Sequence, residues 1–232
     1  MHFGSQLLFK SVQAAHLAAL VAWHAKNRGD RLGGIIFNQD EHLELKPRSR
    51  KEGVLHYLHA LSTLHHSQHK QQYQSKDKEQ QENTPPSDES SSYFSDNCAR
   101  IRQIAKPGSL VYLITDAQQI KNTHTKQQQD ALRHLTQISQ HCELVVCLIK
   151  DSLEQELPNS NIKLNVSLTD GEKRQQLTLG DKTTAITYKE KASIANEQCE
   201  KALIKAGARV INLSAGQTLE QQLKNGDQFC NR

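Results

Sequence analysis

The chain has 232 residues, of which 36% are hydrophobic, and it carries 29 basic and 25 acidic side chains. The two signs of charge are interspersed, which argues against a dedicated nucleic-acid surface, and five cysteines without a short paired spacing argue against a disulfide framework or a thiolate zinc site. No apolar stretch reaches the roughly 18–20 residues of a membrane span, and no signal peptide is evident. We therefore expect a cytoplasmic protein.

The first part of the chain predicts a helix, two strands and a second helix. Residues 7–27 are rich in Ala and Leu and predict a largely buried helix. The apolar residues 31–37 predict an internal strand. The alternating residues 42–46 predict a half-exposed strand that pairs with it and ends at Pro47. Residues 50–64 predict an amphipathic helix.

A low-complexity tract interrupts this pattern. Residues 65–92 are rich in Gln, Ser, Lys and Glu and contain few side chains that could be buried. Such a segment cannot offset its ordering entropy by burial, so we predict a disordered insertion. It separates residues 1–64 from residues 93–213 of one α/β domain, and a polar tail, 214–232, follows.

The second part of the chain alternates strands and helices. Ser95 or Asp96 could cap a helix that runs to about residue 106. The apolar residues 109–115 predict the clearest buried strand of the chain. The order of strand, helix and strand implies parallel pairing with a right-handed crossover. A helix at 126–141 and a strand at 143–149 follow. A hairpin of 162–168 with 174–179, a long helix at 183–206 and a last strand at 208–213 complete the pattern.

This alternation predicts a Rossmann-like three-layer sandwich. Ligands of such sheets bind at the carboxyl ends of the strands, where Asp116 and Asp151 both lie. Asp116 is the best single candidate for a metal or substrate ligand, although its spacing alone favours a structural role, as a helix cap or in a loop hydrogen bond. No glycine-rich dinucleotide or phosphate loop and no nucleophile elbow is present.

The histidines offer a second, weaker candidate. His56 and His59 lie one helical turn apart, a workable spacing for two imidazole ligands, but a solvated helix end explains them as well. No Ser or Cys is placed to pair with the histidines that flank or lie on the helix after Asp116, namely His124, His134 and His141. We therefore expect structural roles for them.

Several segments together resemble a known family. The segments FKSVQAAHLAALVAW, RGDRLGGIIF, GSLVYLITD and DSLEQELP occur in the same order as in the von Willebrand factor A-like proteins of domain-of-unknown-function family 58. The resemblance covers roughly residues 1–65 and 93–213. Genes of this family commonly lie beside those of MoxR-type AAA+ ATPases.

The resemblance implies a metal-ion-dependent adhesion site that holds Mg²⁺ through hard oxygen ligands. Asp116 would be its late aspartate and Ser95 its hydroxyl ligand, unless Ser95 is only a helix cap. Family members carry a first strand and an Asp/Ser loop before the segment that matches MHFGSQLLFK. The resemblance therefore implies that the first central strand and two metal ligands are missing here. Mg²⁺ is then expected only in a full-length form, and residues 1–232 alone are expected to be unstable.

The leading functional hypothesis is a non-catalytic protein-interaction module. It would work with a MoxR-like AAA+ ATPase in assembling a client complex or inserting metal into it. The alternative is a metal-assisted hydrolase in which Asp116 and Asp151 hold a cation that activates water. A third reading is a truncated product without a function of its own.

Overall fold

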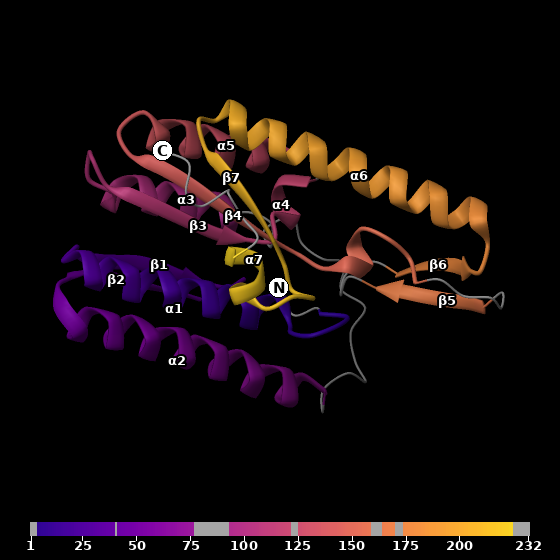
Figure 1. Ribbon diagram of the computed structural model, residues 1–232, viewed down its shortest axis with the longest axis horizontal. Helices are drawn as coiled ribbons and strands as arrows, with labels where there is room; N and C mark the ends of the chain where they lie inside the picture. The colour runs from indigo at the N-terminus through magenta and orange to yellow at the C-terminus, as the bar shows by residue number, and fades with distance from the viewer. Residues whose placement is uncertain are drawn as a thin grey trace.

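A parallel three-stranded sheet lies at the centre of the protein. The computed structural model describes residues 4–39, 41–76, 93–121, 125–158, 164–169 and 174–224. The central sheet has the order β3-β4-β7, and both of its strand pairs are parallel (Figure 1). Its strands are β3 (Leu110–Thr115), β4 (Glu143–Lys150) and β7 (Arg209–Ser214). The parallel pairing and the Rossmann-like α/β layers confirm the fold class predicted from the sequence.

The middle strand, β4, forms the core of the sheet. Its residues from Leu144 to Ile149 are all buried, as expected for a strand that is paired on both edges and covered on both faces. Leu144, Val146 and Leu148 point into one hydrophobic cluster. The alternate residues, which include Cys147, point into a second cluster on the opposite face.

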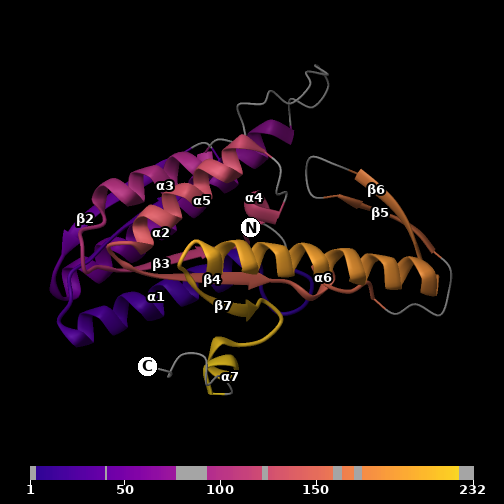
Figure 2. The same cartoon turned by 90° about the horizontal axis from the view of Figure 1, so that it is seen from above.

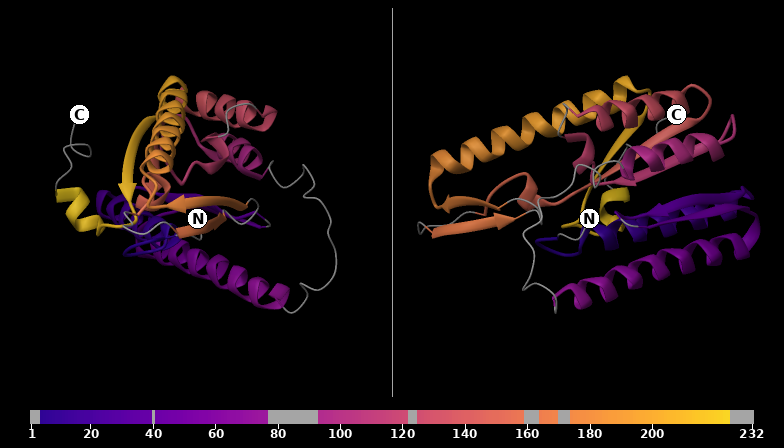
Figure 3. Two further views of the ribbon diagram at one scale, coloured as in Figure 1. Left: turned by 90° about the vertical axis from the view of Figure 1, so that its right-hand side faces the viewer. Right: turned by 180° about the vertical axis from the view of Figure 1, so that it is seen from behind.

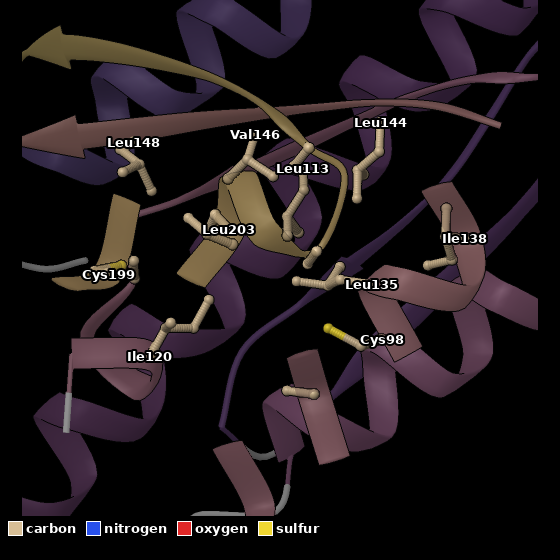
Figure 4. Packing of buried hydrophobic residues seen from close by; sticks show 14 of the residues in the cluster. Cys98, Leu113, Ile120, Leu135, Ile138, Leu144, Val146, Leu148, Cys199 and Leu203 are labelled. Atoms are coloured by element: carbon tan, nitrogen blue, oxygen red, sulfur yellow. The ribbon is translucent and has the colours of Figure 1, made fainter. Parts of the chain in front are cut away.

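Three helices cover the first face. They are α3 (Tyr93–Ile104), α5 (Lys126–Ser139) and α6 (Lys182–Lys205), and the short helix α4 (Gln118–Lys121) follows β3. Figure 4 shows their side chains gathered against the strands, with Leu135 and Leu203 near Val146. This cluster is the largest apolar core of the described residues, and it fixes the direction in which β3 and β4 end.

The opposite face is covered by α1 (Lys10–Arg28), which packs Leu17 against β4 and β7. Gly29 ends this helix in the left-handed conformation, with a φ of 84°, which a residue without Cβ adopts at no steric cost. A short helix, α7 (Leu219–Lys224), lies beside α1. Figure 3 shows α1 and α2 on the side of the sheet opposite to α6. None of the helices in the described ranges is long and apolar enough to cross a bilayer.

An antiparallel hairpin with its own helix forms a separate two-stranded sheet. Its strands are β1 (Leu32–Phe37) and β2 (His42–Arg48), and α2 (Arg50–Lys76) packs on both. A Cβ at Gly34 would lie 3.3 Å from the ring of Tyr57, so the glycine lets this helix approach closely. The predicted pairing is confirmed. Pro47 lies inside β2 rather than ending it, because an edge strand tolerates a residue without N–H.

A second hairpin extends beyond the ends of the central strands (Figure 2). Its strands, β5 (Leu164–Thr169) and β6 (Arg174–Leu179), pair antiparallel, as the sequence predicts. Helix α6 packs on β6 and returns the chain to the sheet. The hairpin therefore connects β4 to α6 without joining the central sheet.

Two segments contain more regular structure than the sequence predicts. Helix α2 continues twelve residues past the expected end at residue 64, to Lys76, because Gln, Lys and His are adequate helix formers even where no apolar residue marks the helix. The expected polar tail contains α7, whose residue Gln222 bonds the backbone of Ser214. Residues 77–92 and 225–232 lie outside the described residues. The disordered insertion therefore stays a prediction for 77–92, and the polar tail stays one for 225–232.

Strands β1 and β3 belong to different sheets, and each is paired on one edge only in the described part of the chain. The expectation that 31–37 is an internal strand was therefore wrong, and its residues are mostly half-buried. Strand β3 is likewise only half-buried, with Leu110 41% exposed, although it was expected to be the clearest buried strand. Both strands have the apolar sequence of an internal strand without a second neighbour.

Candidate functional site

The carboxylate of Asp116 lies at the carboxyl end of β3, as the sequence predicts, and only 7% of its surface is exposed. Its nearest described partner comes from the beginning of α1. The Nζ of Lys10 donates to Oδ2 of Asp116 over 3.1 Å, and the lysine is 2% exposed. The best candidate residue of the sequence is thus one half of a buried ion pair.

The backbone turns sharply directly after Asp116. Ala117 has a φ of 55°, in the left-handed region that residues with a Cβ rarely adopt, and its N–H bonds Oγ1 of Thr115 at 3.1 Å. This conformation costs about 1–2 kcal/mol. It allows α4 to begin at Gln118, immediately after the strand. The turn sets the position of the Asp116 carboxyl group against α1.

A second carboxylate joins the ion pair from the segment after β4. Glu154 closes the short 3₁₀ helix η2 (Ser152–Glu154), and its Oε1 accepts a hydrogen bond from Lys10 and another from Nε2 of Gln118 at 3.0 Å. Its other oxygen, Oε2, is buried and has no hydrogen-bond partner among the described residues. Lys10 therefore bridges two strand ends through one ammonium group.

The ion pair shifts the pKa of both partners toward their charged forms. Burial alone would lower the pKa of Lys10, but the charges of Asp116 and Glu154 outweigh it and raise that pKa above its ordinary value of 10.5. Burial alone would raise the pKa of Asp116, but the positive charges of Lys10 and of the amino terminus, together with the Lys10 hydrogen bond, hold that pKa below its ordinary value of 3.8. Both groups are charged throughout the neutral range.

Asp151, the second strand-end aspartate, is held by neutral groups. It is 1% exposed, and its oxygens accept from the N–H groups of Ser5 and Leu153, each at 2.9 Å. The hydroxyl of Ser5 donates to the same carboxylate and lies 3.2 Å from the hydroxyl of Ser152. The hydroxyl of Tyr188 in α6 bonds the carbonyl of Leu153 at 2.9 Å. Asp151 thus anchors the segment before α1 to the end of β4.

Ser95 occupies a different position from the one expected. Helix α3 begins at Tyr93, so Ser95 lies within its first turn instead of capping it, and it is buried. Its hydroxyl makes no hydrogen bond to Asp116 in the described ranges. The start of α3 nevertheless lies near the end of β3, because the hydroxyl of Tyr93 accepts a hydrogen bond from Gln119.

The described residues do not fit the Mg²⁺ site that the resemblance implies. Mg²⁺ prefers octahedral oxygen ligands at about 2.0–2.1 Å. Here the facing oxygens of Asp116 and Glu154 are taken by an ammonium group, and Asp151 is engaged by N–H and hydroxyl donors. Among the described residues there is no group of three His, Cys, Asp or Glu that could hold a metal ion.

The histidine candidates gain no support as ligands either. His56 and His59 are exposed on α2. His134 lies on α5, where its Nδ1 is buried without a hydrogen-bond partner in the described part of the chain, and His141 is exposed after that helix. His124 lies outside the described residues.

A cleft of about 1590 Å³ separates the β1–β2 hairpin from the central sheet. Residues of β1 and β3 line it along their lengths, and α1, α2 and α3 contribute further residues. On the β3 side, Leu110 and Tyr112 are 41% and 36% exposed. The cleft reaches Asp116 at one end. A six-residue strand fills about 950 Å³ at ordinary strand and sheet spacings, so the cleft is large enough for one.

A comparison with models of protein families shows to which family the chain belongs. The family model described as "Protein of unknown function DUF58" matches residues 1–200. The chain belongs to this family. Searches of the curated proteins and of the solved structures gave no significant match. Membership in DUF58 confirms the family that the sequence motifs indicate and assigns no activity.

The central residue of the site in this DUF58 chain, Lys10, was missed from sequence. One signal was available: a lysine in the first turn of an apolar helix is unfavourable beside the helix dipole, so it indicates a carboxylate partner. Glu154 lies in the DSLEQELP segment that carries the family resemblance. Its pairing with Lys10 spans 144 positions, and no local pattern predicts such a contact.

Proposed function

We propose that this DUF58 chain is a non-catalytic protein-interaction module of the cytoplasm that works with a MoxR-type AAA+ ATPase. The pair would assemble a client complex or insert metal into it. The partner is suggested by the family resemblance in the sequence. The cleft between β1 and β3 is the observation that best supports a binding role, because two apolar strands face it, each paired on one edge only among the described residues.

We propose that the cleft binds an extended segment of the partner by strand addition. Unpaired strand edges offer a row of backbone N–H and C=O groups that an incoming strand can satisfy. The exposed side chains of Leu110 and Tyr112 would supply apolar contacts to it. Asp116, the carboxylate at the end of the cleft, is paired with the Lys10 ammonium and is not a free base, which supports binding in preference to hydrolysis.

The experiment is co-purification of the chain with a MoxR-type ATPase, comparing the unchanged protein with Leu110→Lys. A charge at this position would be desolvated beneath an added strand, so we expect the retained ATPase to fall about tenfold or more. The matched control is Ile194→Lys, an apolar residue of α6 that is 54% exposed and does not line the cleft. It should leave binding unchanged.

Two results would contradict the proposal. If neither the unchanged chain nor the Ile194→Lys control retains the ATPase, the proposed partner is wrong. If Leu110→Lys retains it as well as the control does, the ATPase binds elsewhere and the cleft is not the docking surface. Circular dichroism of both variants excludes unfolding as the cause of a loss.

A further inference from the structure

The strand-end carboxylates have a cation that the chain itself supplies. We propose that the Lys10 ammonium is the resident cation of this site, standing in the place that a divalent metal would need. The ends of β3 and β4 are then held together without Mg²⁺. This inference does not depend on the proposed ATPase partner, because it concerns only contacts within the chain.

The burial of Lys10 is the first argument. At 2% exposure this side chain is among the largest fully buried ones of the described residues. A buried ammonium group is tolerated only where carboxylates and hydrogen bonds replace its water. The ion pair of Lys189 with Glu156 is a contrast, since its partners are 61% and 57% exposed and remain solvated. Lys10 therefore has a fixed electrostatic partner, whereas Lys189 has a surface contact.

The geometry of the oxygens is the second argument. Lys10 faces Oδ2 of Asp116 and Oε1 of Glu154, which come from positions 106 and 144 residues further along the chain. These are the oxygens that a metal bridging the two strand ends would bind. A cation at about 2.0–2.1 Å from each would overlap the ammonium group, so the two cannot occupy the site together. Metal binding requires the lysine to leave.

The charge balance is the third argument. One ammonium faces two carboxylates, and Oε2 of Glu154 is buried without a hydrogen-bond donor in the described ranges. Without Lys10, the buried carboxylate of Asp116 and the half-buried carboxylate of Glu154 would lose their shared cation. The site would then gain affinity for a proton or a metal cation. Shortening Lys10 should therefore convert the site from one that excludes divalent ions into one that binds them.

The test measures Mn²⁺ binding to the full chain by electron paramagnetic resonance and thermal unfolding in EDTA or in excess Mg²⁺. We expect the unchanged protein to unfold at the same temperature in both buffers. Lys10→Ala should unfold at a lower temperature in EDTA and recover with Mg²⁺. It should bind Mn²⁺ about tenfold or more tightly than the unchanged chain, a free-energy difference of about 1.4 kcal/mol. Lys189→Ala is the matched control and should change neither property.

Two results would overturn the inference. The first is Mg²⁺-dependent stabilisation of the unchanged protein that Asp116→Asn abolishes. The second is a folded Lys10→Ala that binds Mn²⁺ no better than Lys189→Ala. If Lys10→Ala does not fold without metal, the triple variant Lys10→Ala, Asp116→Asn, Glu154→Gln tests the inference, because it removes the two carboxylate charges as well. Folding of this triple variant in EDTA supports the inference, and its failure to fold overturns it.

Discussion

Strands β3 and β4 are neighbours with similar apolar sequences and different surroundings. They pair in parallel from Leu110 opposite Glu143 to Thr115 opposite Leu148. β4 has a neighbour on each edge and a run of six buried residues, whereas β3 has one neighbour among the described residues and is half-buried beside the cleft. The difference shows that composition determines that a segment becomes a strand, while its neighbours determine how deeply it is buried.

Each of the two strands is followed directly by an aspartate, and the two aspartates have different partners. Asp116 after β3 is held by a charged group, the ammonium of Lys10. Asp151 after β4 is held by neutral N–H and hydroxyl donors of Ser5 and Leu153. The same side chain at adjacent strand ends thus belongs to an ion pair in one case and to a capping network in the other.

The largest effect is expected in the core of β4. Leu148→Ala removes a side chain that is 2% exposed and leaves a cavity against α6, which should cost about 2–5 kcal/mol in the free energy of unfolding. Urea denaturation followed by circular dichroism measures this loss. A loss below about 1 kcal/mol would mean that β4 is not the closely packed centre of the fold.

The strand ends should differ in their response to the loss of charge. Asp116→Asn leaves the Lys10 ammonium buried beside a neutral amide and should cost about 3 kcal/mol, the lower end for a broken buried pair because Glu154 still faces it and is 18% exposed. Asp151→Asn keeps one acceptor oxygen but places its NH2 group against the N–H of Ser5 or Leu153. No charge is left unpaired, so it should cost about 1–2 kcal/mol. Equal losses in urea denaturation would contradict the distinction between the two ends.

The pH dependence of stability should follow the same distinction. The folded pKa of Asp116 lies below 3.8, so its stabilising contribution is present above that pH and is lost as the pH falls through the folded pKa. The folded pKa of Lys10 lies above 10.5, so its contribution is present below that pH and is lost as the pH rises through the folded pKa. The urea midpoint difference between the unchanged chain and Asp116→Asn should stay constant from about pH 5 to 9 and shrink in acid.

The smallest effect is expected on the open side of β3. Leu110→Ala shortens a side chain that is 41% exposed, so it should cost less than about 1 kcal/mol. Comparison with Leu148→Ala in the same urea experiment keeps the chemistry of the change fixed and varies only the surroundings. A loss as large as that of Leu148→Ala would show that the cleft is closed in solution.

The elements with a strong local pattern could be predicted from the sequence. The buried strand β4 and the hairpin of β1 and β2 both followed from apolar composition and alternation. The burial of β3 could not be predicted, because it depends on which strand lies beside it. The extension of α2 to Lys76 carries no apolar stripe by which to recognise it.

The candidate site was predicted only in part, for a related reason. Asp116 and Asp151 were found because each follows an apolar strand. Lys10, Glu154 and Ser5 were not, because their contacts join segments more than 100 positions apart. Ser95 was proposed as a ligand on family resemblance, and the fold places it inside a helix turn. Contacts across such separations form only in the folded chain, so no spacing of residues in the sequence predicts them.

The anchoring of α1 has a consequence for synthesis. This helix leaves the ribosome early, yet Nε2 of Gln13 bonds the carbonyl of Ser214, which lies 201 positions later. At about 5–20 residues per second, the partner is made some 10–40 seconds after the helix. During that interval α1 can already contact α2, β3 and β4, but its packing on β7 and its hydrogen bond to Ser214 cannot form. The docking of α1 is therefore completed only after β7 has been synthesised.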